Sequence, residues 1–277
     1  MMPALFKACV TTRMPDLAEA FFDEAGAVAQ AISLPHDGAT RVEAYFTGSP
    51  ALGVLSFAHQ DFKLEHVPDE DWVTRSQQNL PPVPVPPFFL FGHYDRPRAR
   101  RARHHIEMDA GLAFGSGHHA TTQGCLLLLA HVLKIRRPMH AADIGTGSGT
   151  LAIAVAKAGC KNVFACDNDP DAVRVARQNF KINTLPAHIR PIWCNGLAHP
   201  AARKAGPFDL IMANILAAPL IAMAPAMAAH LAPTGQLILS GLLHSQKQRI
   251  VARYRHAGLS VQKDIRIGPW TSLMFRR

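Results

Sequence analysis

The amino-acid sequence predicts an α/β protein with a doubly wound, mostly parallel sheet, preceded by a small α+β domain. Three observations lead to this fold class. Helix-like and strand-like segments alternate from about residue 109 to the C-terminus, which is typical of a parallel sheet with right-handed crossovers. A glycine-rich turn follows an early strand of that region. The first seventy residues instead follow a strand–helix–strand–strand order, which is typical of an antiparallel sheet.

The first region, residues 1–69, begins with the strand-like segment "LFKACVTTR". An amphipathic helix is predicted from residue 15 to about residue 33, with Asp16 where an N-cap or first-turn acid belongs. The segments "TRVEAYF" and "FKLEHV" then read as strands. We expect this region to form the small α+β domain.

The second region, residues 70–108, is predicted to connect the two domains. Its segment "LPPVPVPP", residues 80–87, holds five prolines, which forbid a helix and favour an extended chain. The following segment "FFLFGHY" reads as a strand. Because Trp72 and several phenylalanines lie in this region, we expect it to pack against the rest of the protein.

The third region, residues 109–277, is predicted to form the doubly wound sheet. Helices are expected at residues 121–133, 151–158, 170–182, 219–231 and 245–257. Strands are expected at residues 141–144, 162–167, 189–194, 208–215, 236–241, 261–267 and 272–275.

Composition limits the class of protein. The 277 residues suffice for one large or two modest domains. Lys7, Arg13 and Asp16 interrupt the N-terminal apolar runs, and the longest apolar run, residues 215–229, is too short for a bilayer. The five cysteines stand singly without a C-x-x-C pair, which disfavours a zinc site and a disulfide framework. We therefore expect a soluble, cytoplasmic protein without a signal peptide.

The net charge of +9 suits an anionic partner, although it does not establish one. The most basic stretch is "RPRARRARHH", residues 96–105. Its simplest interpretation is a solvated face or linker, and the alternative is a contact with ribosomal RNA. That contact would use Arg96, Arg98, Arg100, Arg101 and Arg103.

The motif that carries most of the chemistry is "AADIGTGSGTLAIAVAKAG". A short apolar strand runs into Gly145, Gly147 and Gly149 and then directly into a helix, so a ligand can approach the backbone and the N–H groups of the helix. The spacing differs from the dinucleotide fingerprint G-x-G-x-x-G, because Thr150 stands where the last glycine would be. Glycine-rich turns alone occur in many α/β domains.

Two carboxylates limit the chemical class of ligand that this turn can bind. Asp167 ends the next predicted strand, where a carboxylate can accept hydrogen bonds from both hydroxyls of a ribose. Asp143 precedes the first glycine, where it would repel a pyrophosphate and suits a cationic group. S-adenosylmethionine has a ribose, no phosphate, an amino group and a sulfonium, so it is favoured over NAD.

Asn214 ends the predicted strand "FDLIMANIL", on the ligand side of such a sheet. Its amide offers one acceptor and two donors. This arrangement resembles methyltransferases that act on amines, in which a polar residue at the end of that strand holds the substrate nitrogen. The alternative role is a cap for the following helix.

The sequence resembles the ribosomal protein L11 methyltransferase family. Members of this family are class I S-adenosylmethionine-dependent protein methyltransferases. The segments that carry the resemblance are "GLAFGSGHHATT", "DIGTGSGTLAIAVAKAG", "ACDNDPDAV", "FDLIMANILAAPL" and "LAPTGQLILSGLL". The first segment, residues 111–122, discriminates best, because other methyltransferases share the glycine turn but lack this preceding loop. Ser116 stands where the family commonly has threonine, and this exchange keeps the hydroxyl.

The resemblance implies roles for these residues. The loop would fold over the methionine end of the cofactor, with Thr121 and Thr122 near its carboxylate and His118 or His119 close by. No metal is expected, because no acid or cysteine stands nearby at ligand spacing. The cofactor-binding set is therefore Thr121, Thr122, Asp143, Gly145, Gly147, Asp167 and Asn214, with Asn214 also the catalytic candidate.

The resemblance also implies the reaction and the substrate. A ferredoxin-like N-terminal domain would grip a large-subunit ribosomal protein, whose lysine and N-terminal amines would be methylated. No general base is evident, so orientation of the amine is expected to dominate catalysis. An RNA or small-molecule N-methyltransferase is the alternative enzyme, and a ribosome-associated binding module without turnover is the alternative outside catalysis.

Overall fold

The structure is a computed structural model, which describes residues 5–13, 18, 22, 27, 29–33, 40–47, 63–67, 82–92, 103–108 and 120–277. It divides the chain into two compact units, Met1–Trp72 and Val73–Arg277. In the part of the chain that it describes, no helix is long and apolar enough to cross a membrane.

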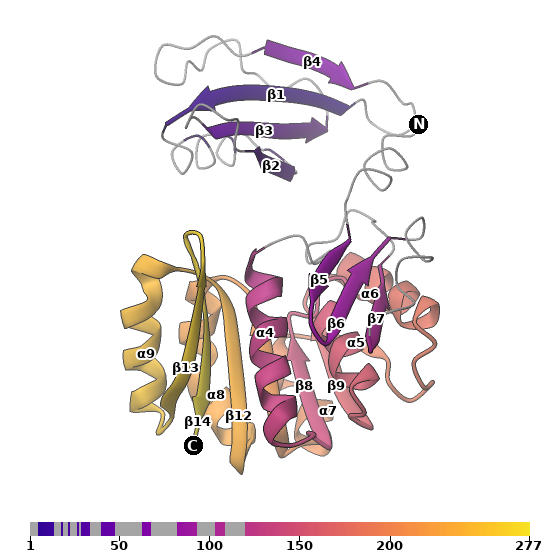
Figure 1. Ribbon diagram of the computed structural model, residues 1–277, viewed down its shortest axis with the longest axis vertical. Coiled ribbons are helices and arrows are strands. Elements are labelled where there is room, and N and C mark those ends of the chain that lie inside the picture. Colours follow the sequence, from indigo (N-terminus) through magenta and orange to yellow (C-terminus); the bar gives the residue numbers. More distant parts are fainter. Residues whose placement is uncertain are drawn as a thin grey trace. The chain divides into compact units, whose positions relative to one another are not determined.

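The first unit contains a four-stranded antiparallel sheet (Figure 1) with the strand order β2-β3-β1-β4. Its strands are β1 (Leu5–Thr12), β2 (Ala29–Ser33), β3 (Thr40–Thr47) and β4 (Lys63–Val67). Alternate side chains point to opposite faces of a strand. One face of this sheet is therefore apolar, and it forms a small core with the helical residues Ala18 and Phe22. The sheet residues of this core are Ala8, Val10, Val42, Ala44 and Phe46.

The predicted helix of the first unit is wrong over residues 29–33. These residues form β2, which pairs with β3 from Ala29 opposite Tyr45 to Ser33 opposite Arg41. Pairing with β3 satisfies the backbone groups that a helix would have satisfied internally, and such tertiary context overrides a weak local preference. Apart from Ala18, Phe22 and Ala27, the rest of the predicted helix lies outside the described residues. So does the segment between β3 and β4, where a ferredoxin-like fold would have its second helix.

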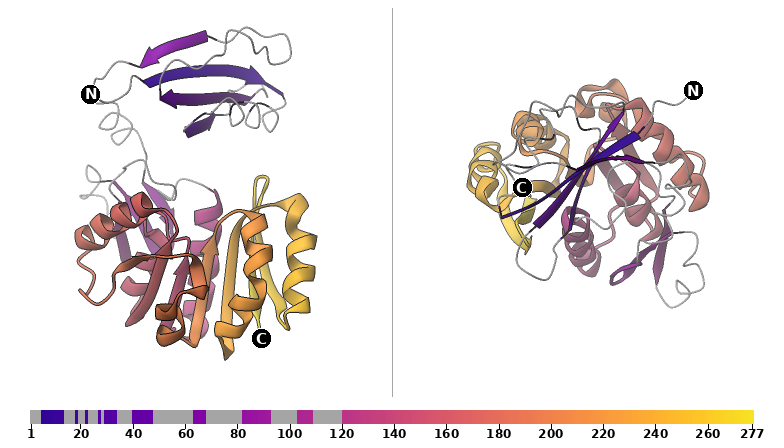
Figure 2. Two further views of the ribbon diagram at one scale, coloured as in Figure 1. Left: turned by 180° about the vertical axis from the view of Figure 1, so that it is seen from behind. Right: turned by 90° about the horizontal axis from the view of Figure 1, so that it is seen from above.

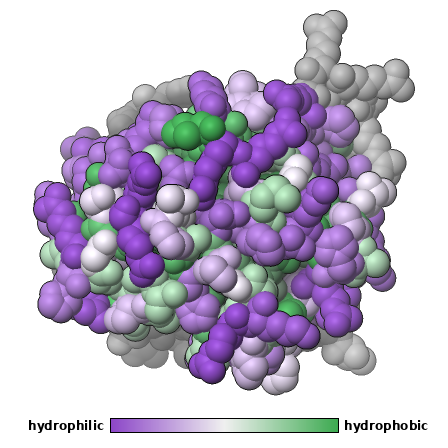
Figure 3. Space-filling model, turned by 90° about the horizontal axis from the view of Figure 1, so that it is seen from below, coloured by the Kyte–Doolittle hydropathy of each residue, from purple (hydrophilic) through white to green (hydrophobic). Residues whose placement is uncertain are grey.

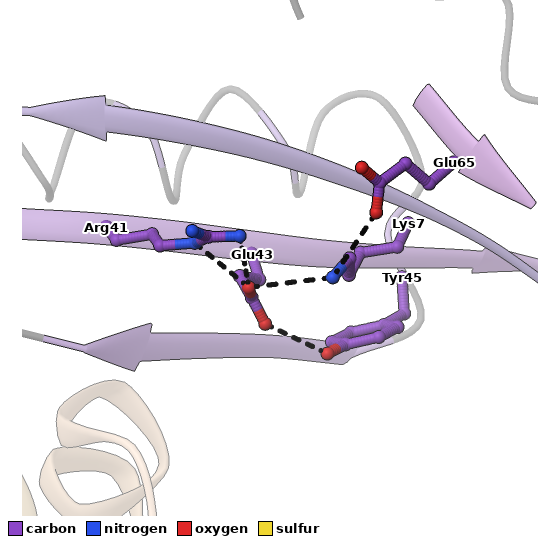
Figure 4. A network of polar contacts seen from close by, with 5 residues as sticks. All are labelled: Lys7, Arg41, Glu43, Tyr45 and Glu65. Atoms are coloured by element: carbon purple, nitrogen blue, oxygen red, sulfur yellow. Dashed lines mark hydrogen bonds and ion pairs between the residues drawn. The ribbon is translucent and has the colours of Figure 1, made fainter. Parts of the chain in front are cut away.

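The opposite face of this sheet is polar and centres on Glu43 (Figure 4). Glu43 accepts hydrogen bonds from Arg41 Nε at 3.0 Å and from the Tyr45 hydroxyl at 3.1 Å. Lys7 Nζ on β1 lies 3.7 Å from both Glu43 Oε1 and Glu65 Oε2. Burial, aided by the charge of Glu43, raises the pKa of Tyr45 to about 12. Cross-strand pairs of opposite charge thus join β1, β3 and β4 on this face.

The second unit is built on a seven-stranded sheet with the order β10-β9-β8-β11-β12-β14-β13. The first five strands of this order are parallel, while β14 and β13 are antiparallel to their neighbours. The predicted fold class, a doubly wound and mostly parallel sheet, is confirmed. The strands are β8 (His140–Ile144), β9 (Asn162–Asp167), β10 (Pro191–Trp193), β11 (Phe208–Asn214), β12 (Leu231–Leu243), β13 (Ser260–Ile267) and β14 (Trp270–Arg276).

Helices cover both faces of this sheet (Figure 2). They are α4 (Ala120–Ile135), α5 (Thr150–Lys157), α6 (Pro170–Ile182), α7 (Pro200–Ala205), α8 (Ala217–His230) and α9 (Lys247–His256). The first three pack with one set of alternate strand residues, including Ala141 and Leu210. The other three pack with the opposite set, including Ala142 and Ile211. This two-sided burial explains why the strands read as continuous apolar runs.

A second, three-stranded sheet belongs to the same unit, with β5 (Val83–Val85), β6 (Phe88–Phe91) and β7 (His104–Glu107) in that order. Its residues Val85, Leu90 and Ile106 lie in one hydrophobic core with α4 and α5. The extended chain is confirmed for Val83–Val85 and the following strand for Phe88–Phe91, both with their packing; Pro86 and Pro87 form the turn between them, and Trp72 and residues 80, 81, 93 and 94 lie outside the described residues. The short elements β7 and α7 were not predicted, because β7 has a single buried apolar residue and α7 has fewer than two turns.

Candidate functional site

The carboxyl ends of the parallel neighbours β8, β9 and β11 lie at one edge of the large sheet, and Figure 1 shows β8 and β9 side by side. Asp143 lies one residue before the end of β8, Asp167 ends β9 and Asn214 ends β11. The N-terminus of α5 directly follows the turn after β8, so its first N–H groups point to the same edge. The edge therefore combines carboxylates, an amide and the backbone N–H groups of a helix N-terminus.

The turn between β8 and α5 depends on glycine. Gly145, Gly147 and Gly149 have φ angles of +69°, +54° and +88°, a region that other residues rarely adopt. A Cβ atom at Gly149 would lie 2.6 Å from Cε1 of Phe180 on α6, and one at Gly145 would collide with the Ile215 side chain. The glycines thus serve both the chain reversal and the close approach of α6 and β11.

Asp143 is almost fully buried, with an exposed fraction of 1%. Its Oδ2 accepts hydrogen bonds from Thr146 Oγ1 at 2.6 Å and from Ala152 N at 3.0 Å, which ties the glycine turn to the first turn of α5. Its Oδ1 has no donor among the described residues. Burial, aided by the charge of Asp167, raises the pKa of Asp143 to about 6. A cationic group of a ligand would relieve this unfavourable charge, so the site fits the amino group and sulfonium of S-adenosylmethionine.

Asp167 is half-buried, and both of its carboxylate oxygens contact backbone N–H groups. Oδ2 accepts from Gly147 N at 2.8 Å, and Oδ1 accepts from Asp169 N at 3.1 Å. These two bonds fix the carboxylate beside the glycine turn. Each oxygen keeps a lone pair for a further donor, so the carboxylate fits the two hydroxyls of a ribose.

Asn214 and Thr122 are in contact. The Asn214 Nδ2 donates to Thr122 Oγ1 over 3.3 Å, which links the end of β11 to the first turn of α4. Thr122 is 1% exposed and Thr121 is 3% exposed. Next to Asn214 in the sheet register lies Ser240, whose Oγ is 2.7 Å from Ser272 Oγ. The neighbours Thr122, Ser240 and Ser272 are buried, whereas Asn214 itself is partly exposed.

Comparison with known proteins decides the family. The sequence profile described as "Ribosomal protein L11 methyltransferase (PrmA)" matches residues 18–277 of this chain. The chain belongs to the ribosomal protein L11 methyltransferase family.

Individual relatives agree with this family. The ribosomal protein L11 methyltransferase of Bradyrhizobium diazoefficiens is 45% identical over 270 residues, which covers 94% of this chain and 91% of the relative. That of Brucella suis is 46% identical over 212 residues, or 76% of this chain and 74% of the relative. The crystal structure of ribosomal protein L11 methylase from Lactobacillus delbrueckii subsp. bulgaricus has a TM-score of 0.65 and 32% identity, covering 72% of this chain and 99% of that one.

Membership of this methyltransferase family agrees with the arrangement at the sheet edge. The structure brings together Asp143, Gly145, Gly147, Asp167 and Asn214, with Thr121 and Thr122 on the adjoining helix turn. Residues 109–119, with Ser116, His118 and His119, lie outside the described residues. Within the ranges that the structure describes, no group of three or more histidines, cysteines or acids could hold a metal ion.

Several residues of the site were not predicted from the sequence. Thr146 binds Asp143, and Asn179 Nδ2 on α6 donates to the Ser148 carbonyl oxygen at 2.8 Å. Asn179 is fully buried, although α6 is otherwise amphipathic. An asparagine on the apolar side of a predicted helix is the one sequence signal that could have identified it. Trp193 is two-thirds exposed and lies opposite Asp167 in the sheet register. No pattern in the sequence marked this residue.

Proposed function

We propose that this protein transfers methyl groups from S-adenosylmethionine to lysine and N-terminal amines of ribosomal protein L11, in the cytoplasm where ribosomes assemble. One observation carries the proposal within the family: the Asp167 carboxylate is held 2.8 Å from the N–H group of Gly147. A ribose-binding acid and a glycine turn thus form a single nucleoside site. Asn214, at the same edge, supplies a polar group for the amine.

The residues that would hold the cofactor divide by chemistry. Asp167 would accept hydrogen bonds from the ribose hydroxyls, while Gly145 and Gly147 let the nucleoside approach the backbone. Asp143 would compensate positive charge electrostatically, because its Oδ1 is buried and lacks a described donor. Thr121 and Thr122 lie in the first turn of α4, where backbone N–H groups suit a carboxylate. When bound, S-adenosylmethionine supplies an electrophilic methyl group on its sulfonium.

The role of Asn214 would be to orient the substrate nitrogen. Because its Nδ2 donates to Thr122, its Oδ1 remains an acceptor for an N–H of the amine. A single accepted hydrogen bond fixes one N–H and turns the lone pair of the nitrogen in a defined direction. Orientation of this kind converts binding into rate without an acid or a base.

The protonation state of the amine determines which target amines react readily. A lysine with a pKa of about 10.4 is neutral only about once in a few thousand molecules at pH 7, while an N-terminal amine with a pKa of roughly 7.7–8.0 is neutral far more often. Desolvation lowers the pKa of an amine, so exclusion of water near Asn214 would favour the reactive neutral form. Solvent would then accept the proton before the amine reaches the site.

The charge of the first unit supports recognition of a basic protein there. Residues 1–72 contain 11 acids against four lysines and arginines, a net charge of −7. In the described sheet the cations Lys7 and Arg41 are both paired with Glu43 (Figure 4). A negative surface attracts and orients a positively charged partner such as an RNA-binding protein.

One experiment tests the proposed function. The protein is incubated with cofactor labelled in its methyl group, purified ribosomal protein L11 and ribosomal RNA, and the labelled molecule is identified by mass spectrometry. We expect label on lysine and N-terminal amines of L11, and loss of label with Asp167→Ala. Label on RNA alone would replace the proposal by an RNA methyltransferase, and label on L11 at other atoms would overturn the amine assignment.

A further inference from the structure

Charge is distributed very unevenly along this chain. Residues 73–277 hold 25 lysines and arginines against nine acids, a net charge of +16, whereas residues 1–72 carry −7. Residues 120–277 contain six aspartates and no glutamate. Four of these aspartates, at positions 143, 167, 169 and 171, belong to β8, β9 and the start of α6, at the cofactor edge of the sheet. The negative charge of the second unit is thus concentrated where the cofactor would bind.

The two remaining aspartates are occupied by nearby groups. Asp209, at the start of β11, accepts backbone hydrogen bonds from Met139 and His140 and lies 3.7 Å from Arg136 Nη2. Asp264 on β13 lies 2.8 Å from Lys247 Nζ. Neither carboxylate is left to neutralise the other cations at the edge of the sheet opposite Asp167.

At that opposite edge lie five basic side chains from three parts of the chain, at or next to the elements β7, α4 and α5, which share one hydrophobic core. Arg103 precedes β7, His104 and His105 lie within β7, Arg137 follows α4, and Lys157 ends α5. We call these five residues the basic cluster. Burial first, and then the charges of the other four members, lowers the pKa of His104. The segment after α4 lies beside the end of α5, since a Cβ atom at Gly159 would lie 3.8 Å from Cδ of Arg137.

Few acidic groups neutralise the positive charge of the basic cluster. Among the described residues, Arg103, Arg137 and Lys157 form no ion pair. Glu107 on β7 is the one acid whose charge acts on Lys157, and burial still lowers the pKa of Lys157 overall. Figure 3 looks onto this edge, and hydrophilic side chains cover most of it. Basic side chains held together at a surface, with Glu107 the one described acid that acts on Lys157, favour binding of an external polyanion.

We propose that the basic cluster binds the phosphate backbone of RNA, at the edge of the sheet opposite Asp167 and Asn214. Two of its members are arginines, whose planar guanidinium groups match phosphate with paired hydrogen bonds. Phosphate contacts of this kind supply affinity without base sequence.

The location has a functional consequence. Because the basic cluster lies on the side of the second unit opposite the cofactor edge, RNA and cofactor would bind without competition. The protein could then hold RNA while the other edge acts on a protein amine. The inference does not depend on which molecule is methylated, since it concerns binding alone.

The test measures binding of the full-length protein to a fluorescent RNA duplex of about 20 base pairs, by anisotropy, at salt concentrations from about 50 to 200 mM. The variant is Arg103→Gln/Arg137→Gln/Lys157→Gln. The matched control is Arg249→Gln/Arg255→Gln/Lys263→Gln, which removes three charges from exposed positions of α9 and β13. Both variants lower the net charge equally, so only position distinguishes them.

We expect the cluster variant to lose at least about tenfold in affinity and to lower the slope of log affinity against log salt by about two to three. The control variant should change affinity less than about threefold. Cofactor affinity and methyl transfer to protein should match wild type in both. If the triple variant unfolds, Arg103→Gln alone, at an exposed position, should still lower the slope by about one.

Equal binding by the cluster variant and wild type, or equal losses in the two variants, would overturn the proposal. So would salt-sensitive self-association of the wild type without RNA that the cluster variant abolishes, because the occupant would then be the acidic first unit of a second copy. Sedimentation at the same salt concentrations distinguishes this case. Absence of methyl transfer by a wild-type protein that binds RNA would contradict the proposed function and not this inference.

Discussion

The Nδ2 atom of Asn214 donates a hydrogen bond to the Oγ1 atom of Thr122 over 3.3 Å, across 92 positions of the chain. This contact uses one of the two N–H groups of the amide and fixes its orientation, so the amide oxygen is left as an acceptor for a ligand. Thr122 is buried and Asn214 is partly exposed, so Thr122 acts as the fixed partner. We infer that Thr122 orients Asn214 in addition to, or in place of, a contact with the cofactor.

Replacement of Asn214 by alanine should lower kcat far more than it weakens cofactor binding. The lost hydrogen bond to a reacting amine corresponds to about 1.5–3 kcal/mol, or roughly a 10- to 150-fold loss of kcat. An interaction aimed at the reacting nitrogen acts on the transition state. Calorimetry, single-turnover methyl transfer and the thermal midpoint separate this role from cofactor binding and from helix capping. A normal single-turnover rate would remove Asn214 from catalysis.

Thr122→Val should reproduce a weaker form of the same defect, because valine keeps the shape of threonine and removes the acceptor. We expect kcat to fall roughly 3- to 10-fold, corresponding to about 0.5–1.5 kcal/mol for one hydrogen bond. Thr122→Ser should restore most of the rate. If the affinity for cofactor falls first and serine does not restore kcat, then Thr122 is primarily a cofactor ligand.

Asp167→Ala should weaken cofactor binding by roughly 10- to 150-fold for each hydrogen bond lost to the ribose hydroxyls. The matched control is Asp169→Ala, two residues further along. Asp169 caps α6 by accepting from Asp171 N at 2.8 Å, so its removal should cost about 1 kcal/mol of stability and leave cofactor affinity unchanged. Calorimetric titration of both variants measures the contrast, and equal affinities would refute the ribose role.

Prediction from sequence succeeded best where strong local signals coincide with the buried pattern. Helix α6 was predicted with both ends as observed, because Asp169 and Pro170 mark its start and its apolar residues repeat at helical spacing. Strand β9 was likewise predicted in full. Strand β12 begins five residues earlier than predicted. Its first part contains Pro233 and Gly235, which are typical of turns, so an extended chain was not predicted there.

The candidate site was predictable as a set of strand ends but not as a set of contacts. Parallel order places Asp143, Asp167 and Asn214 at one edge, and the sequence indicates that order. The hydrogen bond between Asn214 and Thr122 depends on how α4 crosses the sheet, which no local pattern encodes. The same holds for the Asn179 contact with Ser148 and for the packing of β7. Long-range contacts of single polar atoms require the folded structure.

Gly145→Ala should destabilise the protein and block the cofactor. Its φ of +69° costs a residue with a Cβ atom about 1–2 kcal/mol, and the new methyl group would also displace Ile215. The control is Gly258→Ala, where φ is +83° and nothing lies within 4 Å of the added Cβ. We expect similar strain in both variants but loss of cofactor binding only in the first. Thermal melts and titrations on the pair provide the measurement.

The last prediction concerns Asp143, whose pKa burial raises from 3.8 to about 6. Between these two pH values the folded protein without cofactor binds more protons than the unfolded chain. The free energy of unfolding should therefore fall as the pH rises through this window, and then level off above about pH 6. Asp143→Asn should remove this component of the pH dependence. Chemical denaturation at several pH values, from about 4 to 7, measures both proteins.

Cofactor affinity should show the opposite trend, because a cationic ligand favours the ionised carboxylate. In the wild type, affinity should rise by up to about tenfold per pH unit below pH 6 and become constant above it. The amino group of the cofactor, with a pKa of roughly 7.7–8.0, stays charged over this range, so the change would belong to the protein. Asp143→Asn should bind more weakly at pH 7 and with little dependence on pH from 5 to 7. An unchanged pH profile in that variant would show that Asp143 organises the glycine turn through Thr146 and Ala152 without sensing the charge of the ligand.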